Sequence, residues 1–297
     1  MIGRHAGRSH PGRRRRRNED AFVIAPPLFA VADGMGGARA GEIASRLAAA
    51  AVKEDQGERA DVAELIQEAN RRVFERARDD ASASGMGTTM TVALVEDAQV
   101  TIGHVGDSRA YRLRDNALEQ LTEDHSLVAE LVRSGKLSPE EAESHPQRSV
   151  ITRALGTEAD VDVDTFTVEA QPGDVFLLCS DGLTTMVEEE HIVGVVERNR
   201  RDLERAAKEL IADANRSGGD DNVTVVFFEI VEQGDTARME AVDVDEDTLT
   251  EVDEVPVVET GEKRRLRAGA VIPAVIVLAA AAIVVLLVLM DVISVPL

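Results

Sequence analysis

Acidic side chains recur at predicted turns and strand ends in five short motifs of this 297-residue chain, and these are its best candidates for chemistry. The motifs are NED (18–20), ADGMGG (32–37), GDSR (106–109), SDGL (180–183) and GGDDN (218–222). One Asp-Gly pair alone usually marks only a turn. Carboxylates that converge, however, raise one another's pKa unless a cation lies between them. Because Mg²⁺ and Mn²⁺ prefer oxygen ligands, the five motifs together predict a divalent-metal site.

Other catalytic chemistries find little support in the sequence. The six histidines show no zinc-binding spacing, and GMGGAR lacks the third glycine of a dinucleotide-binding loop. Walker and kinase motifs are absent as well. Cys179 lies in an apolar run, which favours a buried structural thiol, and Thr185 stands where a cysteine-dependent phosphatase would need arginine.

The acidic motifs lie at the ends of segments with strand-like or helical patterns. Strands are predicted by β-branched and aromatic runs at 28–32, 89–95, 100–105, 110–113, 175–179 and 223–230. Helices are predicted by apolar periodicity at 40–53, 62–78 and 203–215. Consecutive strands joined by short turns indicate antiparallel pairing, so we expect sheet layers covered by helices.

The order of the motifs resembles a known family. GRRRRRNEDAF, FAVADGMGG, GMGTTM, GHVGDSRAY, LLCSDGL and GGDDNVTVV, found between Gly12 and Ile230, are similar to the bacterial metal-dependent protein phosphatases of the protein phosphatase 2C type. The resemblance implies an α+β fold, a four-layer αββα sandwich of two antiparallel β-sheets flanked by helices. It places the phosphatase domain at 12–231, preceded by an N-terminal extension at 1–11. It also implies two Mn²⁺ or Mg²⁺ ions that hydrolyse phosphoserine and phosphothreonine through a bridging water.

The resemblance assigns metal ligands residue by residue. Asp33 matches the carboxylate that bridges both metals, and Asp181 and Asp221 complete the first metal site. Glu19 and the backbone carbonyl of Gly34 serve the second site, mostly through waters.

Four further positions have roles only through the resemblance. Asp20 matches an acid behind the metal ligands, and Asp107 one that helps to hold a third, weaker metal. Arg15 occupies the place of the arginine that grips the substrate phosphate. Met35 replaces the histidine with which eukaryotic relatives protonate the leaving group, so the acid that does so stays open. The segment 124–156 resembles a mobile flap beside the active site, the alternative being an ordinary pair of surface helices.

Charge is distributed unevenly along the chain. The formal net charge is -22, yet residues 1–17 contain seven Arg and no acid, and residues 232–262 contain twelve acids and one Arg. The overall charge argues against nucleic acid as a partner. Residues 232–267 are expected to form an acidic flexible linker with a basic end.

Residues 268–290 are predicted to form a transmembrane helix, because 23 uncharged residues exceed the roughly 20 that a bilayer requires. KRRLR at 263–267 precedes them, which places the large N-terminal part in the cytoplasm and leaves 291–297 as a short extracytoplasmic tail. No apolar stretch follows the N-terminal arginines, so they do not resemble a secretory signal. The expected localisation is the cell membrane, with a single span.

Two functions follow from this sequence. The first is a membrane-tethered phosphatase acting on phosphorylated proteins, including Ser/Thr kinases. The alternative is a catalytically weak scaffold that binds phosphoproteins with the same fold. A scaffold is expected to have lost a metal carboxylate, whereas Glu19, Asp33, Asp181 and Asp221 are all present.

Overall fold

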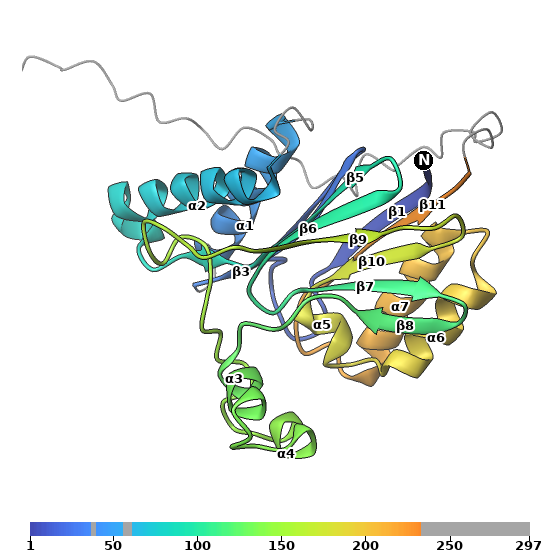
Figure 1. Ribbon diagram of the computed structural model, residues 1–297. Coiled ribbons are helices and arrows are strands. Elements are labelled where there is room, and N and C mark those ends of the chain that lie inside the picture. The colour runs from blue at the N-terminus through green and yellow to red at the C-terminus, as the bar shows by residue number, and fades with distance from the viewer. Residues whose placement is uncertain (37–39, 56–60, 233–297) are drawn as a thin grey trace, which may run out of the picture. The chain divides into compact units, whose positions relative to one another are not determined.

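Two antiparallel sheets form the centre of the computed structural model, which describes residues 1–36, 40–55 and 61–232 (Figure 1). The first sheet has the order β1 (Ile2–His10), β11 (Val223–Ile230), β10 (Val175–Cys179), β7 (Arg109–Arg114) and β8 (Ala117–Gln120). The second has the order β2 (Asp20–Ala25), β3 (Leu28–Met35), β5 (Met90–Glu96), β6 (Gln99–Val105) and β9 (Asp164–Glu169), with β4 (Gly87–Thr88) paired to β3.

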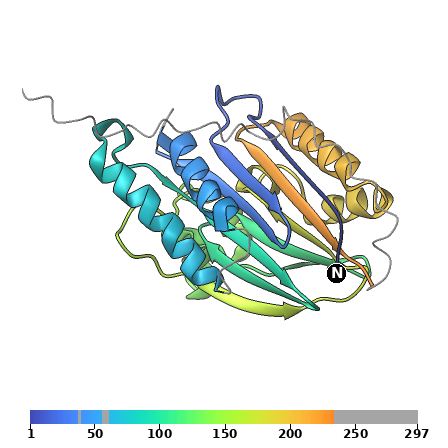
Figure 2. The same cartoon turned by 90° about the horizontal axis from the view of Figure 1, so that it is seen from above.

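Helices cover the outer face of each sheet, as Figure 2 shows from above. Helices α1 (Ala40–Asp55) and α2 (Val62–Asp79) pack on the second sheet, and α6 (Glu189–Arg198) and α7 (Leu203–Ser217) pack on the first. The four layers confirm the αββα arrangement that the resemblance implied. Between α2 and β4 the chain adds a short 3₁₀ helix, Ala81–Ala83.

Alternation along the strands explains how the layers form. In β3, Phe29 and Val31 belong to the core between the two sheets, whereas Leu28, Ala30 and Ala32 pack against α1 and α2. Both faces of this strand are therefore buried, and an almost continuous apolar run is what such a strand requires. Phe29 stacks on Phe228 of β11 with ring centroids 4.4 Å apart, which joins the two sheets directly.

The N-terminal residues differ from the sequence prediction. We expected residues 1–11 to be an extension before the domain, but Ile2–His10 forms β1, paired antiparallel with β11. The segment contains charged and small residues rather than an apolar run, so periodicity gave no strand signal. Its stability comes from the β11 backbone beside it, which is a tertiary contact.

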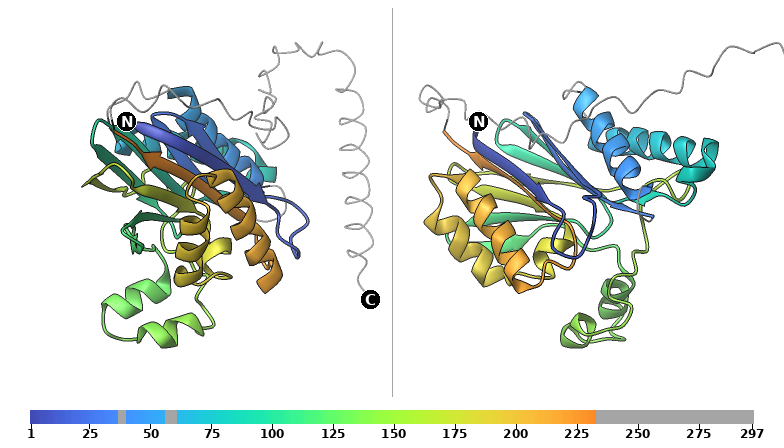
Figure 3. Two further views of the ribbon diagram at one scale, coloured as in Figure 1. Left: turned by 90° about the vertical axis from the view of Figure 1, so that its right-hand side faces the viewer. Right: turned by 180° about the vertical axis from the view of Figure 1, so that it is seen from behind.

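Several shorter elements were also absent from the prediction. The sequence pattern did not predict these elements because they are short or contain both polar and apolar residues. They are β2, β4, β8, β9, α5 (Asp181–Thr184) and α6. Within the predicted flap lie two short helices, α3 (Leu127–Arg133) and α4 (Pro139–Glu143), which project away from the sheets (Figure 3). The helices fit the alternative of a surface helix pair, and mobility of this segment stays a prediction.

The predicted membrane span at 268–290 and most of the acidic linker lie outside the described residues. The chain divides into two units, Met1–Val252 and Asp253–Leu297, and the second unit lies entirely outside them. None of the helices in the described ranges combines the length and hydrophobicity of a bilayer span.

Candidate metal and phosphate site

Five aspartates of the predicted site lie at strand ends. Asp20 begins β2 and is paired across the sheet with Asp33, near the end of β3. In the other sheet, Asp181 follows β10, while Asp107 and Asp221 come just before β7 and β11. Since β10 is antiparallel to both β7 and β11, its end lies beside their beginnings. The topology thus gathers residues far apart in sequence at one end of the sandwich.

Asp20 connects the two sheets through hydrogen bonds. One of its carboxylate oxygens accepts the hydroxyls of Ser180 at 2.9 Å and Thr224 at 2.6 Å, both from the other sheet. Its second oxygen, Oδ1, is buried and has no hydrogen-bond partner. Burial raises the pKa of Asp20 to about 7. The hydrogen bonds from the two hydroxyls lower this pKa, whereas the negative charges of Asp181 and Asp221 raise it. Sequence reasoning missed Ser180 and Thr224, although Ser180 lies inside the SDGL motif.

The backbone of Asp33 is fixed on both sides. Its N–H donates to Thr89 Oγ1 at 2.9 Å, and its carbonyl accepts the Thr88 hydroxyl at 2.9 Å. Burial raises the pKa of the Asp33 carboxyl well above its usual range, and the negative charges of Asp20 and Asp181 raise it further. The two threonines of GMGTTM therefore set the position of an acid that other acids surround.

Asp107 and Asp181 belong to the same electrostatic group. Burial raises the pKa of Asp107 to about 8, with the charges of Asp181 and Asp124 adding to the effect. Burial also raises the pKa of Asp181 to about 6, with a contribution from Asp221. Mutual repulsion of this kind is what a divalent cation between the acids would relieve.

The backbones of Glu19 and Gly34, the two groups predicted to serve the second metal, are hydrogen-bonded to each other. The Glu19 carbonyl accepts the N–H of Gly34 at 3.1 Å, and the Glu19 N–H donates to Asn222 Oδ1 at 2.7 Å. A Cβ on Gly34 would come within 2.2 Å of the carbonyl oxygen of Gly41, so no larger residue fits there. Asn222, whose role the sequence did not reveal, also donates to the carbonyl of Arg17 at 2.9 Å and so holds this loop.

Arg15 reaches the acidic cluster from the arginine loop. Its Nη2 donates to Asp221 Oδ2 at 2.7 Å, and its side chain is 53 % exposed. A guanidinium that is half exposed and anchored at the edge of the cluster is placed to receive an anion from solvent. Two other arginines of the run have different partners, since Arg14 pairs with Asp220 and Arg17 with Glu42.

The donor set fits a hard divalent cation. Carboxylates, the Gly34 carbonyl and the orphaned Asp20 Oδ1 offer oxygen, and the acids raise one another's pKa. Within the described ranges, no three His, Cys, Asp or Glu side chains lie close enough together to form a complete ligand group. That these acids are close together is shown by their charges, which raise one another's pKa, and not by a complete set of metal ligands.

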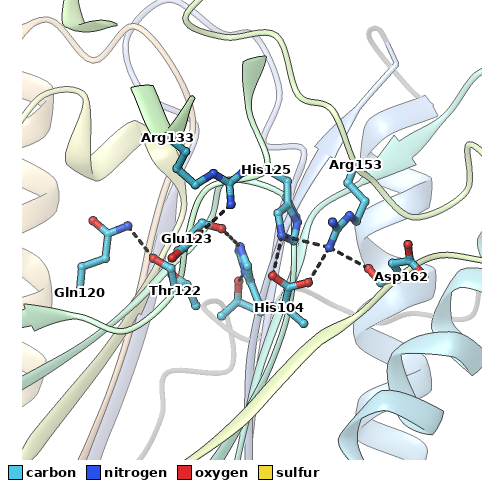
Figure 4. A network of polar contacts seen from close by, with 11 residues as sticks. His104, Gln120, Thr122, Glu123, His125, Arg133, Arg153 and Asp162 are labelled. Carbon is cyan, nitrogen blue, oxygen red and sulfur yellow. Dashed lines mark hydrogen bonds and ion pairs between the residues drawn. The ribbon is translucent and has the colours of Figure 1, made fainter. Parts of the chain in front are cut away.

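His104 and His125 form a buried pair (Figure 4), and His125 supports the turn that carries Asp107. Gly106 accepts the His125 N–H through its carbonyl at 2.7 Å, and its own N–H donates to His125 Nδ1 at 3.0 Å. Because Nδ1 is an acceptor, the neutral ring is assigned its proton on Nε2, which lies 3.1 Å from Asp164 Oδ2 of β9 and 3.1 Å from Arg153 Nη1. His104 packs on this ring with centroids 4.8 Å apart.

This histidine network also ties down the base of the helical segment. His125 accepts the N–H of Thr152 at 2.8 Å, so both ends of the segment containing α3 and α4 meet at one residue. Arg153 donates to Asp164 Oδ1 at 2.6 Å and to the Asp162 carbonyl at 3.2 Å (Figure 4). The sequence predicted only that these histidines would be surface or satisfied structural residues, and the second description is confirmed for His104 and His125.

Cys179 is buried at the end of β10, which confirms the prediction of a structural thiol. Burial raises its pKa to about 12, so the reactive thiolate form is strongly disfavoured.

Comparisons with known proteins agree with the resemblance. Residues 6–215 match the family model described as protein phosphatase 2C. The serine/threonine phosphatase stp of Listeria welshimeri is 43% identical over 237 residues, covering 75% of this chain and 94% of that protein. The serine/threonine protein phosphatase PstP of Mycobacterium tuberculosis is 40% identical over 260 residues, which cover 84% of this chain and 50% of PstP.

Solved structures show the same fold. The crystal structure of the M. tuberculosis phosphatase PstP/Ppp matches with a TM-score of 0.73 at 40% identity, covering 78% of this chain and 100% of that one. A catalytic domain of PstP in complex with two manganese ions matches with a TM-score of 0.71 at 37% identity, covering 78% of this chain and 99% of that one.

Proposed function

Because this chain belongs to the protein phosphatase 2C family and is a protein serine/threonine phosphatase, we propose that its strand-end acids hold two Mn²⁺ or Mg²⁺ ions for the hydrolysis of phosphoserine and phosphothreonine. The two manganese ions of the related PstP domain support this stoichiometry. The observation that carries the proposal is the convergence of acids whose pKa is raised by burial and by one another.

The proposed ligands follow the positions described above. Asp33 would bridge the two ions, with Asp181 and Asp221 completing one metal site and Glu19 and the Gly34 carbonyl serving the other. Bound divalent ions supply Lewis acidity and an activated water for attack on phosphorus. Asp107 belongs to the same cluster and would contribute to a third, weaker site.

The chain's own groups position the substrate and the ligands. Arg15 binds the phosphate oxygens and stabilises their growing negative charge during displacement. Asp20 keeps the two sheets in register at the site through its bonds to Ser180 and Thr224. Met35 has no proton to give, so in our proposal the leaving seryl or threonyl oxygen takes its proton from water.

An assay with and without metal tests this function. Residues 1–232 should hydrolyse p-nitrophenyl phosphate and a phosphothreonine peptide in the presence of Mn²⁺ and lose that activity in EDTA. The scaffold alternative predicts that the phosphopeptide binds without turnover under both conditions. Peptide binding with no Mn²⁺-dependent release of phosphate would therefore favour the scaffold.

We also propose that the phosphatase is tethered to the cell membrane with its catalytic domain in the cytoplasm. The support is the sequence alone, namely the uncharged residues 268–290 behind KRRLR. An acidic linker of about 30 residues reaches roughly 30 Å by square-root scaling, and further when like charges extend it. The proposed substrates are phosphorylated proteins near the membrane, including Ser/Thr kinases.

Truncation after Glu262 tests the tether. The shortened protein should appear in the soluble fraction with unchanged turnover of p-nitrophenyl phosphate, whereas the full chain should sediment with membranes. A truncated protein that still sediments with membranes would contradict the tether.

A further inference from the structure

A basic groove lies beside the arginine loop, outside the acidic cluster. Its volume is about 420 Å³, and α7 and the end of β1 form its walls. Arg13, Lys208 and Arg216 supply its cations, with His10 and Asn215 beside them. The chain has a net charge of -22, so three cations around one groove are unusual. The proposed hydrolysis assigns no role to any of the three.

Two of these cations have no ion-pair partner among the residues that the structure describes. Arg13 and Lys208 are exposed, and no carboxylate of the described residues lies within the 4.0 Å ion-pair distance of either. Arg216 pairs with Asp213 but keeps 71% of its side chain exposed. An incoming anion would therefore meet these cations without first breaking an ion pair at Arg13 or Lys208.

The histidine of the groove adds a hydrogen-bond donor. His10 Nδ1 accepts the N–H of Gly12 at 3.0 Å and faces the side-chain nitrogen of Asn215 at 3.3 Å. With Nδ1 acting as an acceptor, the ring proton lies on Nε2. Within the described part of the chain, Nε2 has no acceptor, so its N–H is available to a ligand.

The groove and the candidate catalytic site share two chain segments. The Gly219 carbonyl accepts the Arg13 N–H at 2.8 Å, while two residues further along both segments Arg15 bonds to Asp221. Gly12 makes this packing possible, because it has φ +75 and a Cβ there would lie 2.1 Å from the Asp221 carbonyl oxygen. The Cα atoms of Arg13 and Arg15 are at most about 7 Å apart, which a peptide spans in two or three residues.

We propose that the basic groove binds an anionic side chain of the phosphoprotein substrate, two or three residues from the phosphoserine or phosphothreonine that Arg15 holds. The groove thus selects substrates with Asp, Glu or a second phosphorylated residue near the target. This inference rests on the proposed function and adds a substrate class to it.

Paired phosphopeptides test the groove with the full-length protein in detergent. One phosphothreonine peptide carries Asp at positions −3, −2, +2 and +3, and its partner carries Asn there. Exposed ion pairs each contribute modestly, so we expect kcat/KM to favour the acidic peptide by about three- to tenfold, mainly through KM. The preference should shrink as salt is raised, since exposed charges are screened.

Variants locate the effect. The single variant Lys208→Met should reduce the preference for the Asp peptide over the Asn peptide. The double variant, Lys208→Met with Arg13→Gln, should bring the ratio of the two kcat/KM values close to one. Turnover of the Asn peptide should stay unchanged in both variants. Lys53→Met removes the same charge from an exposed position on α1 and should keep the full preference.

The outcomes separate the two proposals. If neither peptide is hydrolysed in Mn²⁺, the proposed function fails. If both are hydrolysed equally, or if the double variant keeps the full preference, the function stands and the groove proposal is overturned.

Discussion

Two acidic regions of this molecule have opposite electrostatics. On the surface of α2, Glu68 accepts hydrogen bonds from Arg71 and Arg72, each at 2.8 Å, and the Arg71 bond is the main reason why the pKa of Glu68 falls to about 2. At the strand ends, burial raises the pKa of Asp20 to about 7 and that of Asp107 to about 8.

The difference lies in what accompanies each acid. The helix supplies a cation for its carboxylate within one turn, whereas the strand ends bring acids next to other acids and remove them from water. A protein of marginal stability keeps such an arrangement at a cost to its own stability, and functional sites are where that cost is commonly found. The comparison therefore predicts that changes at the strand ends alter function and changes on α2 do not.

Asp33→Asn should have the largest effect. The amide keeps nearly the same shape as the carboxylate, so the pairing of β3 with β2 and the fold should survive. Loss of one charge-stabilising group typically costs about 10²- to 10³-fold in turnover, and here the proposed bridging ligand is lost as well. Mn²⁺-dependent hydrolysis of a phosphothreonine peptide measures the loss, with circular dichroism as the folding control. Activity within about threefold of the parent would defeat the bridging role.

Stability without metal should fall as pH rises. The folded pKa values of Asp181, Asp20 and Asp107, about 6, 7 and 8, all lie above their ordinary value of 3.8. The folded state then binds more protons than the unfolded state, so the stability these groups contribute is present below about pH 4 and is lost as pH rises to about 8.

Thermal unfolding in EDTA and in Mn²⁺ measures this linkage. Metal binds the deprotonated acids, so Mn²⁺ should raise Tm more at pH 8 than at pH 5. An equal increase at both pH values would contradict the assignment of these acids as ligands.

His125→Ala should have an intermediate effect. The change leaves the buried N–H of Gly106 without its acceptor, and an unsatisfied buried group typically costs about 1–3 kcal/mol. Chemical denaturation should show a loss of that size. His145→Ala, whose hydrogen bond is exposed, is the matched control and should change stability little. Equal losses for both variants would remove the special role of the His125 network.

Glu68→Gln should have the smallest effect. The Glu68 side chain is 17% exposed, but its partner Arg71 is 53% exposed, and ion pairs at the surface contribute about 0–1 kcal/mol. We therefore expect Tm to fall by a few degrees at most and turnover to stay within twofold. The stability that Glu68 contributes is present above its ordinary pKa of 4.5 and is lost as pH falls through about 2, the reverse of the strand-end acids. A large loss of turnover in this variant would break the contrast between the two regions.

The sequence by itself singled out a set of acids as candidate metal ligands and predicted antiparallel sheet layers covered by helices. Three of these acids, Asp33, Asp181 and Asp221, each lie between an apolar run and a glycine or Asn turn. This pattern involves only neighbouring residues, so it can be recognised without the tertiary structure. The helices α1, α2 and α7 were visible for the same reason, since their apolar periodicity is written in consecutive residues.

Only the tertiary structure decided which groups meet. Ser180 and Thr224 bond to Asp20 across 160 and 204 residues of chain, and no local pattern records such a pairing. Strand β1 likewise has no apolar run and exists because β11 offers it a backbone partner. Local propensity acts over a few residues, whereas the pKa of Asp20 and the alignment of Arg13 with Gly219 depend on burial and contacts that exist only after the sheets have packed.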